Sequence, residues 1–184
     1  MRTLPRFRVA AMATLLLVSL AACGGSSSAP TPPPTPQPGI TYRSSASPAP
    51  ANSIVLETRS SDPQQITLAL KANAVTDLYG VALDIRFNTA IVSFESFSAR
   101  DFLGDEGTSM STQIVENPAG TLVIGQSKFG AVDGSEGTGD MMVLTFRAVT
   151  AGPSAITIAN QGAYDPEGSI TSTSFFGGTL TVVQ

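Results

Sequence analysis

The sequence contains no histidine, no tryptophan and a single cysteine, Cys23. Without histidine or a second cysteine, His-based catalytic triads, His/Cys metal sites and intrachain disulfides are all excluded. Glycine-containing segments at residues 125–130 and 137–139 lack the spacing of a nucleophile elbow or of a dinucleotide-binding loop. Paired carboxylates for glycoside cleavage depend on spatial separation, and no pair stands out in the sequence. We therefore expect a protein that is not an enzyme.

Long apolar runs are scarce, and the main one, residues 9–22, follows a head with three arginines and no acid. A basic head, a short apolar run and small residues are typical of a secretory signal. The run is shorter than the roughly 18 residues of a membrane span. Its end, Leu20-Ala21-Ala22-Cys23, resembles the lipobox of bacterial lipoproteins, which implies cleavage before Cys23 and lipidation of that residue. The alternative is an ordinary signal peptide with a chance cysteine.

Removal of residues 1–22 would reduce the basic residues from 10 to 7 against 14 acids, which changes the formal charge from −4 to −7. Such an acidic chain disfavours nucleic acid as a partner. Lipid, and not a basic patch, is then the expected link to the membrane. Because Gly24 and not aspartate follows the cysteine, the lipoprotein resemblance implies an exported protein at the outer membrane or cell surface.

Residues 23–51 form a low-complexity segment rich in proline, serine and glycine. Such sequence is flexible where Gly and Ser dominate and extended where prolines follow one another. It has few apolar side chains to offset the entropy of ordering, so we expect no packed structure here. We interpret it as a spacer before a folded domain at residues 52–184. The alternative is a ligand for a proline-reading domain.

The folded domain is organised around residues 78–97, LYGVALDIRFNTAIVSFESF. Residues alternate along its first half, which places two sets of side chains on opposite faces of a strand. The set expected to face the core is Val81, Leu83, Ile85 and Phe87. The set expected to face outward includes Ala82, Asp84 and Arg86. Residues 88–90 then turn the chain into a second apolar strand.

Similar short alternating segments recur at residues 66–71, 121–127 and 141–149, and residues 117–120 have the composition of a hairpin turn. Helical spacing is not found after residue 22. Many short alternating strands separated by glycine and proline turns predict an all-β, antiparallel sandwich or barrel.

These segments also carry a family resemblance. The pattern L-Y-G-V-x-L-D-I-x-F-N at residues 78–88 looks like the front half of a bacterial cohesin module. Residues 137–148 resemble its later G-x-G…L-x-F-K-A strand, and residues 151–183 are similar to its closing elements. The resemblance spans residues 53–184 and implies a jelly-roll β-sandwich of about nine strands, related in architecture to several carbohydrate-binding modules.

The cohesin resemblance implies non-covalent recognition of an extracellular protein, a dockerin-like or other partner, on the outer surface of the strand at residues 80–86. The candidate partner-binding residues are Ala82, Asp84 and Arg86. The asparagine and aspartate that many dockerin-binding cohesins carry early on this strand are replaced by Gly80 and Ala82. In the alternative interpretation, Asp84 and Arg86 simply form a solvated polar face.

Two further functions are kept as alternatives. The first is a carbohydrate-binding module that attaches the cell or an enzyme to a polysaccharide. Sugar sites usually present flat aromatic rings, for which Tyr79 and Tyr164 are the candidates, although tyrosines near strand ends also cap cores. The second is a passive structural role in the envelope.

Acidic residues cluster in two predicted loops, and oxygen ligands at short spacing bind calcium in extracellular proteins. The clusters are Asp101, Asp105 and Glu106, and then Asp133, Glu136 and Asp140. Neither fits the EF-hand pattern. We expect no cofactor and no metal, with solvated loop acids as the interpretation and calcium as the alternative.

Overall fold

The structure is a computed structural model that describes residues 37–104 and 109–184. These residues form strands and no helix, and so none of them belongs to a helix long and apolar enough to span a membrane. The strands are β1 (Gly39–Ser44), β2 (Ser53–Ser61), β3 (Gln65–Leu78), β4 (Gly80–Arg86), β5 (Val92–Ala99), β6 (Met110–Glu116), β7 (Thr121–Lys128), β8 (Ser135–Ala148), β9 (Gly152–Tyr164), β10 (Ser174–Phe176) and β11 (Gly178–Val183).

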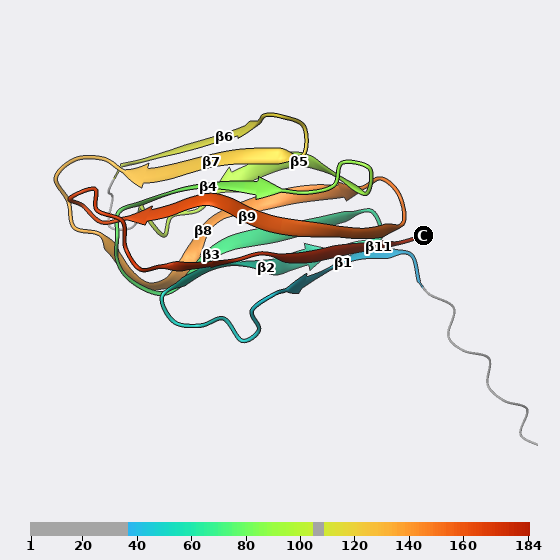
Figure 1. Cartoon of the computed structure of the whole chain (residues 1–184), viewed down its shortest axis with the longest axis horizontal. Coiled ribbons are helices and arrows are strands. Elements are labelled where there is room, and N and C mark those ends of the chain that lie inside the picture. Colours follow the sequence, from blue (N-terminus) through green and yellow to red (C-terminus); the bar gives the residue numbers. More distant parts are fainter. Residues whose placement is uncertain (1–36, 105–108) are drawn as a thin grey trace, which may run out of the picture. The chain divides into compact units, whose positions relative to one another are not determined.

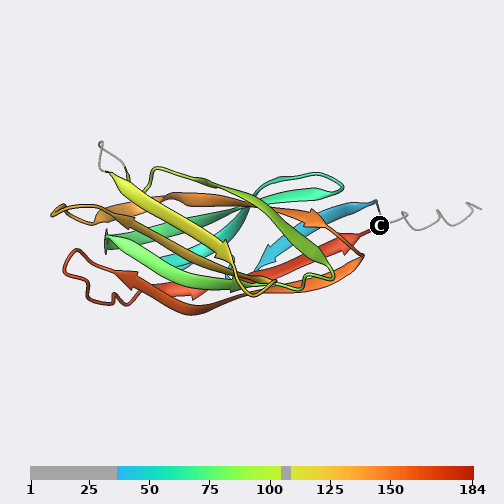
Figure 2. The same cartoon turned by 90° about the horizontal axis from the view of Figure 1, so that it is seen from above.

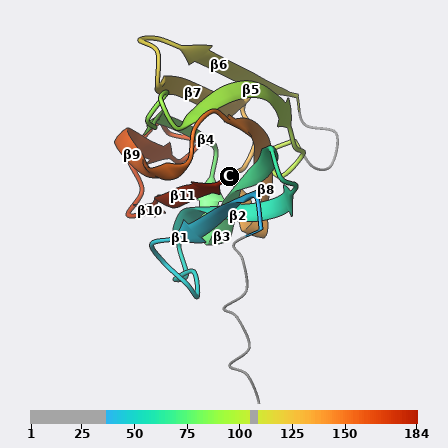
Figure 3. The same cartoon turned by 90° about the vertical axis from the view of Figure 1, so that its right-hand side faces the viewer.

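The strands form two sheets that enclose one core (Figure 1). The six-stranded sheet has the order β1-β11-β9-β4-β7-β6, and the five-stranded sheet has the order β10-β2-β3-β8-β5. Neighbouring strands are antiparallel, except that β10 runs parallel to β2. The view along the strands shows the two layers edge-on (Figure 3). The predicted all-β antiparallel sandwich is confirmed, and residues 37–104 and 109–184 contain eleven strands where about nine were expected.

The core contains the residues that the alternating pattern of the sequence predicted to face inward. β4 buries Val81, Leu83 and Ile85 between the sheets, as predicted. Phe146 of β8 is fully buried, and its ring meets that of Phe87 edge-on with 5.4 Å between ring centres. Full burial of one such side chain contributes roughly 1.5–3 kcal/mol. The buried face therefore holds the opposite face of β4 at the surface.

The two turns predicted around β4 and β6 are present. Asn88 Oδ1 accepts the N–H of Ala90 at 3.0 Å, and the Asn88 carbonyl accepts the N–H of Val92 at 3.0 Å. At the β6–β7 turn, Gly120 has a φ of 82°, and a Cβ there would lie 2.8 Å from Phe87 O. Only glycine combines this backbone conformation with so close an approach. The hairpin therefore docks against the end of β4.

The prediction that residues 39–51 have no packed structure is wrong. Residues of β1 pair with β11 along its whole length, from Gly39 opposite Val183 to Ser44 opposite Gly178. Ile40 is fully buried, because alternation of Ile40 and Tyr42 with polar residues gives even this short strand an inward face. The folded domain therefore includes β1 and does not begin at residue 52. Residues 23–36 of the predicted spacer, and the predicted signal peptide, lie outside the described residues.

The sandwich has two distinct ends. The start of β1 and the end of β11 lie together at one end, because Gly39 pairs with Val183. The start of β9 is at this end too, since Gly152 pairs with Val182. The thirteen residues of β9 then run to Tyr164 at the opposite end, a distance of about 40 Å. Figures 1 and 2 show the loops after β7 and β9 at that opposite end.

Candidate functional site

Four strands of the larger sheet, β6, β7, β4 and β9, present one continuous outer face. Cross-strand register aligns their outward residues in rows. The row nearest the end of β9 is Ser111, Ser127, Gly80 and Tyr164. The second row is Gln113, Gly125, Ala82 and Gly162. The third row is Val115, Val123, Asp84 and Ala159. Small residues thus occupy the centre of this face, and larger side chains lie at its borders.

A groove of about 430 Å³ lies at the end of this face. Gly80 and Gly125 line it, and neither has a side chain to fill it. At Gly125 no atom lies within 4 Å of the position that a Cβ would take, so the space above β7 is open. Glycine inside a strand often marks a place where a ligand or another backbone approaches closely. The glycines of these strands therefore create the groove.

One wall of the groove comes from β9 and the turn that follows it. Tyr164 folds back over Gly162, where a Cβ would lie 2.7 Å from the tyrosine hydroxyl oxygen. The Ser169 N–H donates to Asp165 Oδ1 at 2.7 Å, and the Asp165 N–H donates to Ser169 O at 3.0 Å. These hydrogen bonds hold the turn, including Pro166, against the groove. A wall fixed before binding lowers the entropy cost of association.

The other border carries two aromatic residues. Phe129 follows β7, and 57% of its surface is exposed. The Tyr79 hydroxyl donates to Gly130 O at 2.8 Å, which ties the loop after β7 to the start of β4. An exposed phenylalanine beside a concave surface offers an apolar contact to a binding partner.

Two further exposed apolar residues lie on the two outer strands, one row beyond the groove. Val115 of β6 and Val123 of β7 are paired directly, and they are 58% and 46% exposed. We refer to Phe129, which lines the groove, together with Val115 and Val123, which lie one row beyond it, as the apolar border of the groove. Single exposed apolar residues are common on protein surfaces, but a group beside a groove indicates an interaction site.

Asp84 and Arg86 occupy the part of β4 beyond the groove. Asn160 Nδ2 donates to Asp84 Oδ2 at 2.6 Å, and an Arg86 nitrogen lies 3.9 Å from the same oxygen. Asn160 reaches Asp84 because β9 has a bulge at this point, where the Asn160 φ is 48°. β-Bulges redirect side chains in this way. Asp84 is therefore held in place, whereas Arg86 is exposed.

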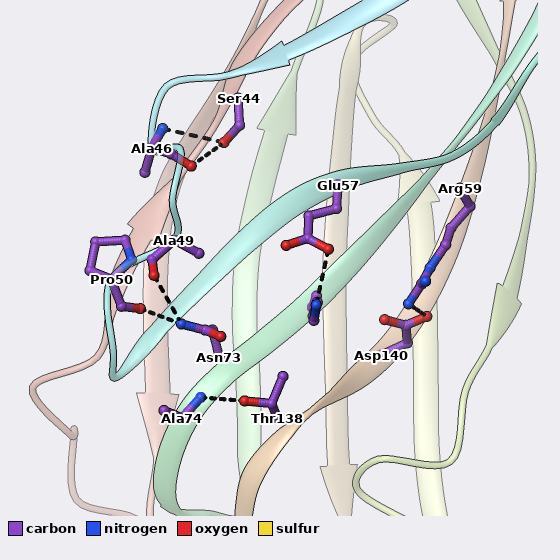
Figure 4. A network of polar contacts seen from close by, with 11 residues as sticks. Ser44, Ala46, Ala49, Pro50, Glu57, Arg59, Asn73, Ala74, Thr138 and Asp140 are labelled. Atoms are coloured by element: carbon purple, nitrogen blue, oxygen red, sulfur yellow. Dashed lines mark hydrogen bonds and ion pairs between the residues drawn. The ribbon is translucent and has the colours of Figure 1, made fainter.

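The outer face of the five-stranded sheet is different, because its central charges are paired with one another. Lys71 lies 3.0 Å from Glu57, and Arg59 pairs with Asp140 (Figure 4). A third pair joins Arg147 to Glu95. The hydrogen bond from Arg147, and a second one from Gln65, lower the pKa of the Glu95 carboxyl. This face offers paired, solvated charges in place of an apolar groove.

The described residues show no constellation for metal chemistry. No three metal-ligating side chains come together in residues 37–104 and 109–184. The acids of the second predicted cluster are thus not gathered into a calcium site, and Asp140 forms its ion pair with Arg59 instead. Asp105 and Glu106 of the first cluster lie outside the described residues. The outer face is suited to non-covalent recognition through shape and apolar contact.

The structure places all three predicted site residues on the outer face of β4. Ala82 is paired with Gly125, which lines the groove, but does not line it itself, and Asp84 and Arg86 lie further along the strand. Their role in binding stays a prediction, and Cys23 lies outside the described residues. Sequence reasoning missed the groove formed around Gly125, although glycine at an outward strand position was a usable signal.

Comparison with known proteins relates the chain to cohesins through its fold alone. No protein-family model matches the sequence, and no curated protein sequence matches it. Among solved structures, a type I cohesin–dockerin complex from Clostridium thermocellum matches 72% of this chain and 100% of that chain, with a TM-score of 0.56 and 14% identity. The match to a type II cohesin from the cellulosome of Acetivibrio cellulolyticus covers 73% of this chain and 93% of the cohesin, with a TM-score of 0.54 and 14% identity.

A third similar structure is the sixth cohesin of scaffoldin B from Acetivibrio cellulolyticus, in complex with a Cel5 dockerin. The match covers 62% of this chain and 86% of the cohesin, with a TM-score of 0.54 and 12% identity. The predicted cohesin-like jelly-roll sandwich is therefore confirmed as the fold.

Proposed function

We propose that this chain is a binding module that recognises an extracellular protein on the outer face of β6, β7, β4 and β9. The observation that carries the proposal is the groove with its apolar border, on a sheet face whose centre is made of small residues. The opposite face of the sandwich pairs its central charges internally. Two of the similar cohesin structures are complexes with dockerins, which supports a dockerin-like partner.

The proposed location of the protein is the cell envelope, where lipid on Cys23 anchors it and the residues between Cys23 and β1 act as a spacer. The folded domain begins at Gly39, which lies at the same end of the sandwich as the start of β9. The groove lies at the end of β9, about 40 Å from its start. A module anchored through its N-terminus would thus present the groove away from the membrane. Replacing Cys23 with serine should move the protein from the membrane fraction to the soluble exported fraction.

The binding test uses isothermal titration calorimetry of the purified chain with dockerin modules of exported proteins from the same organism. Gly125→Trp places a large side chain in the groove, at a position where the added Cβ has no atom within 4 Å. Thr41→Trp is the matched control, because Thr41 is exposed on β1, at the far edge of the same sheet.

We expect the wild type and Thr41→Trp to bind alike and Gly125→Trp to bind roughly 100-fold more weakly, since blocking a central pocket removes about 2–4 kcal/mol. A dockerin that binds all three proteins equally would show that the groove is not the site. Retardation of the chain by soluble polysaccharides in affinity electrophoresis, with no dockerin bound, would favour the carbohydrate-binding alternative.

A further inference from the structure

The free edge of β6 differs from the other sheet edges of the described residues. β6 pairs with β7 over seven residues, from Met110 opposite Lys128 to Glu116 opposite Leu122, without a register shift. In the described part of the chain no other strand is hydrogen-bonded to it, and it forms the border of the six-stranded sheet (Figure 3). A regular strand with an unpaired row of N–H and C=O groups is a template for another strand.

The three remaining edges are each protected. β1 lies against β2, where the Ser61 hydroxyl donates to Ile40 O. β10 has only three residues. β5 has a bulge between Phe94 and Ser96, and the intervening Glu95 is charged. Coverage, shortness, bulges and charges are the devices that prevent strands from pairing at an edge. Among the described residues no segment pairs with the outer edge of β6, which is seven residues long and has no bulge, and its one charged residue, Glu116, is its last.

The register shows which backbone groups face the free edge. The Asn117 N–H donates to Thr121 O at 2.9 Å, and the Phe129 N–H donates to Ser109 O at 2.9 Å. Bonded and non-bonded pairs alternate in an antiparallel ladder, so the odd-numbered residues of β6 bond to β7. The even-numbered residues direct N–H and C=O to the free edge. They are Met110, Thr112, Ile114 and Glu116.

We infer that β6 pairs with β6 of a second copy of this chain, antiparallel and about a two-fold axis at Gln113. In this register Thr112 lies opposite Ile114 of the second copy, and the even-numbered residues form about eight backbone hydrogen bonds. No like charges meet, since the two Glu116 side chains lie at opposite ends of the pair. Two copies thereby join their six-stranded sheets into one continuous sheet.

The chain's own N-terminal segment does not fit this edge. It contains six prolines between residues 30 and 38, and proline has no N–H to donate to a strand. It also enters the fold at β1, the opposite border of the same sheet. A seven-residue strand pair buries less area than the roughly 1,200–2,000 Å² of a stable interface. The dimer is therefore reversible, and it forms where copies are concentrated.

Pairing through β6 has a consequence for the groove. Ser111 and Gln113 of β6 line the groove, so the two grooves of the dimer lie on either side of the two-fold axis. A dimer with two sites on one sheet binds a multivalent partner more tightly than a monomer does. The dimer itself does not depend on what the groove binds.

Sedimentation velocity of the purified chain over a concentration series tests this inference. The directly opposed Gln113 residues have Cβ atoms about 5 Å apart, so Gln113→Lys places two cations against each other, and Gln113→Glu two anions. Gln113 is exposed, and circular dichroism should show that both variants fold. We expect the wild type to dimerise as concentration rises and each variant alone to dimerise at least about tenfold more weakly.

An equimolar mixture of the lysine and glutamate variants should restore dimerisation, because opposite charges then meet at the axis. A wild-type chain that stays monomeric up to about 1 mM would overturn the inference. Variants that dimerise as well as the wild type would overturn it too, because the contact would then lie elsewhere. Neither outcome depends on the proposed protein partner, since only self-association is measured.

Discussion

Replacing Gly162 with alanine tests whether Tyr164 forms the wall of the groove. A Cβ at this position would lie 2.7 Å from the Tyr164 hydroxyl oxygen and 2.9 Å from its Cζ. Atoms in good contact are about 3.5–4 Å apart, so the ring must move by roughly 1 Å. Overpacking of this kind costs about 1–3 kcal/mol. The outer end of one side chain takes up the movement, which favours the lower half of that range.

Gly125→Ala is the matched control, because its Cβ would have no atom within 4 Å. Alanine inside a strand is about 0.5–1 kcal/mol more favourable than glycine. We therefore expect Gly125→Ala to raise the free energy of unfolding and Gly162→Ala to fall about 1–2 kcal/mol below it. In a Tyr164→Ala background the two glycine substitutions should have the same effect, which gives a coupling of about 1–2 kcal/mol between positions 162 and 164.

Urea unfolding provides the measurement, followed by far-ultraviolet circular dichroism because the chain has no tryptophan. The midpoint and slope give the free energy of unfolding for the wild type and each variant. Equal effects of the two glycine substitutions in the wild-type background, or the absence of coupling with Tyr164, would refute the described position of the tyrosine ring.

Two further predictions concern β1. Ile40→Ala should lower the free energy of unfolding by about 2–5 kcal/mol, because Ile40 is fully buried; a loss below about 0.5 kcal/mol in urea unfolding would show that β1 is not part of the fold. Burial raises the pKa of Tyr42 from 10.0 to about 12, so its contribution to stability is complete below pH 10 and is lost as the pH rises towards 12. The free energy of unfolding should fall by about 1–2 kcal/mol between about pH 9 and about pH 11.5, after allowance for the partial exposure of Tyr42. Tyr42→Phe should abolish this fall. A fall of the same size in the variant would assign it to other groups.

The fold was predictable where the pattern is local. Alternation along β4 identified Val81, Leu83 and Ile85 as the buried face, and each lies in the core. β1 was missed because the prolines and serines around it indicated a spacer, while only Ile40 and Tyr42 carry the apolar alternation. Its pairing with β11 is a contact between distant parts of the chain, which local composition does not reveal.

The outer face of β4 was predictable, and the groove was not. Strand register assigned Ala82, Asp84 and Arg86 to the outside, because a period of two is a property of the strand itself. The groove depends on Gly80 and Gly125 becoming neighbours through pairing of β4 with β7. Its walls depend on the hydrogen-bonded turn after β9 and on the Tyr79 hydroxyl, which binds Gly130 O in the loop after β7. These arrangements arise only when segments far apart in sequence come together.

The central claim is that a protein partner occupies the groove and its apolar border. Hydroxyl-radical footprinting of the chain, alone and with a bound dockerin module, tests it at single side chains. We predict that Phe129, which is 57% exposed, loses reactivity in the complex, while Phe97 of β5, 42% exposed in the other sheet, keeps its reactivity. Protection of Phe97 with unchanged reactivity of Phe129 would contradict the claim.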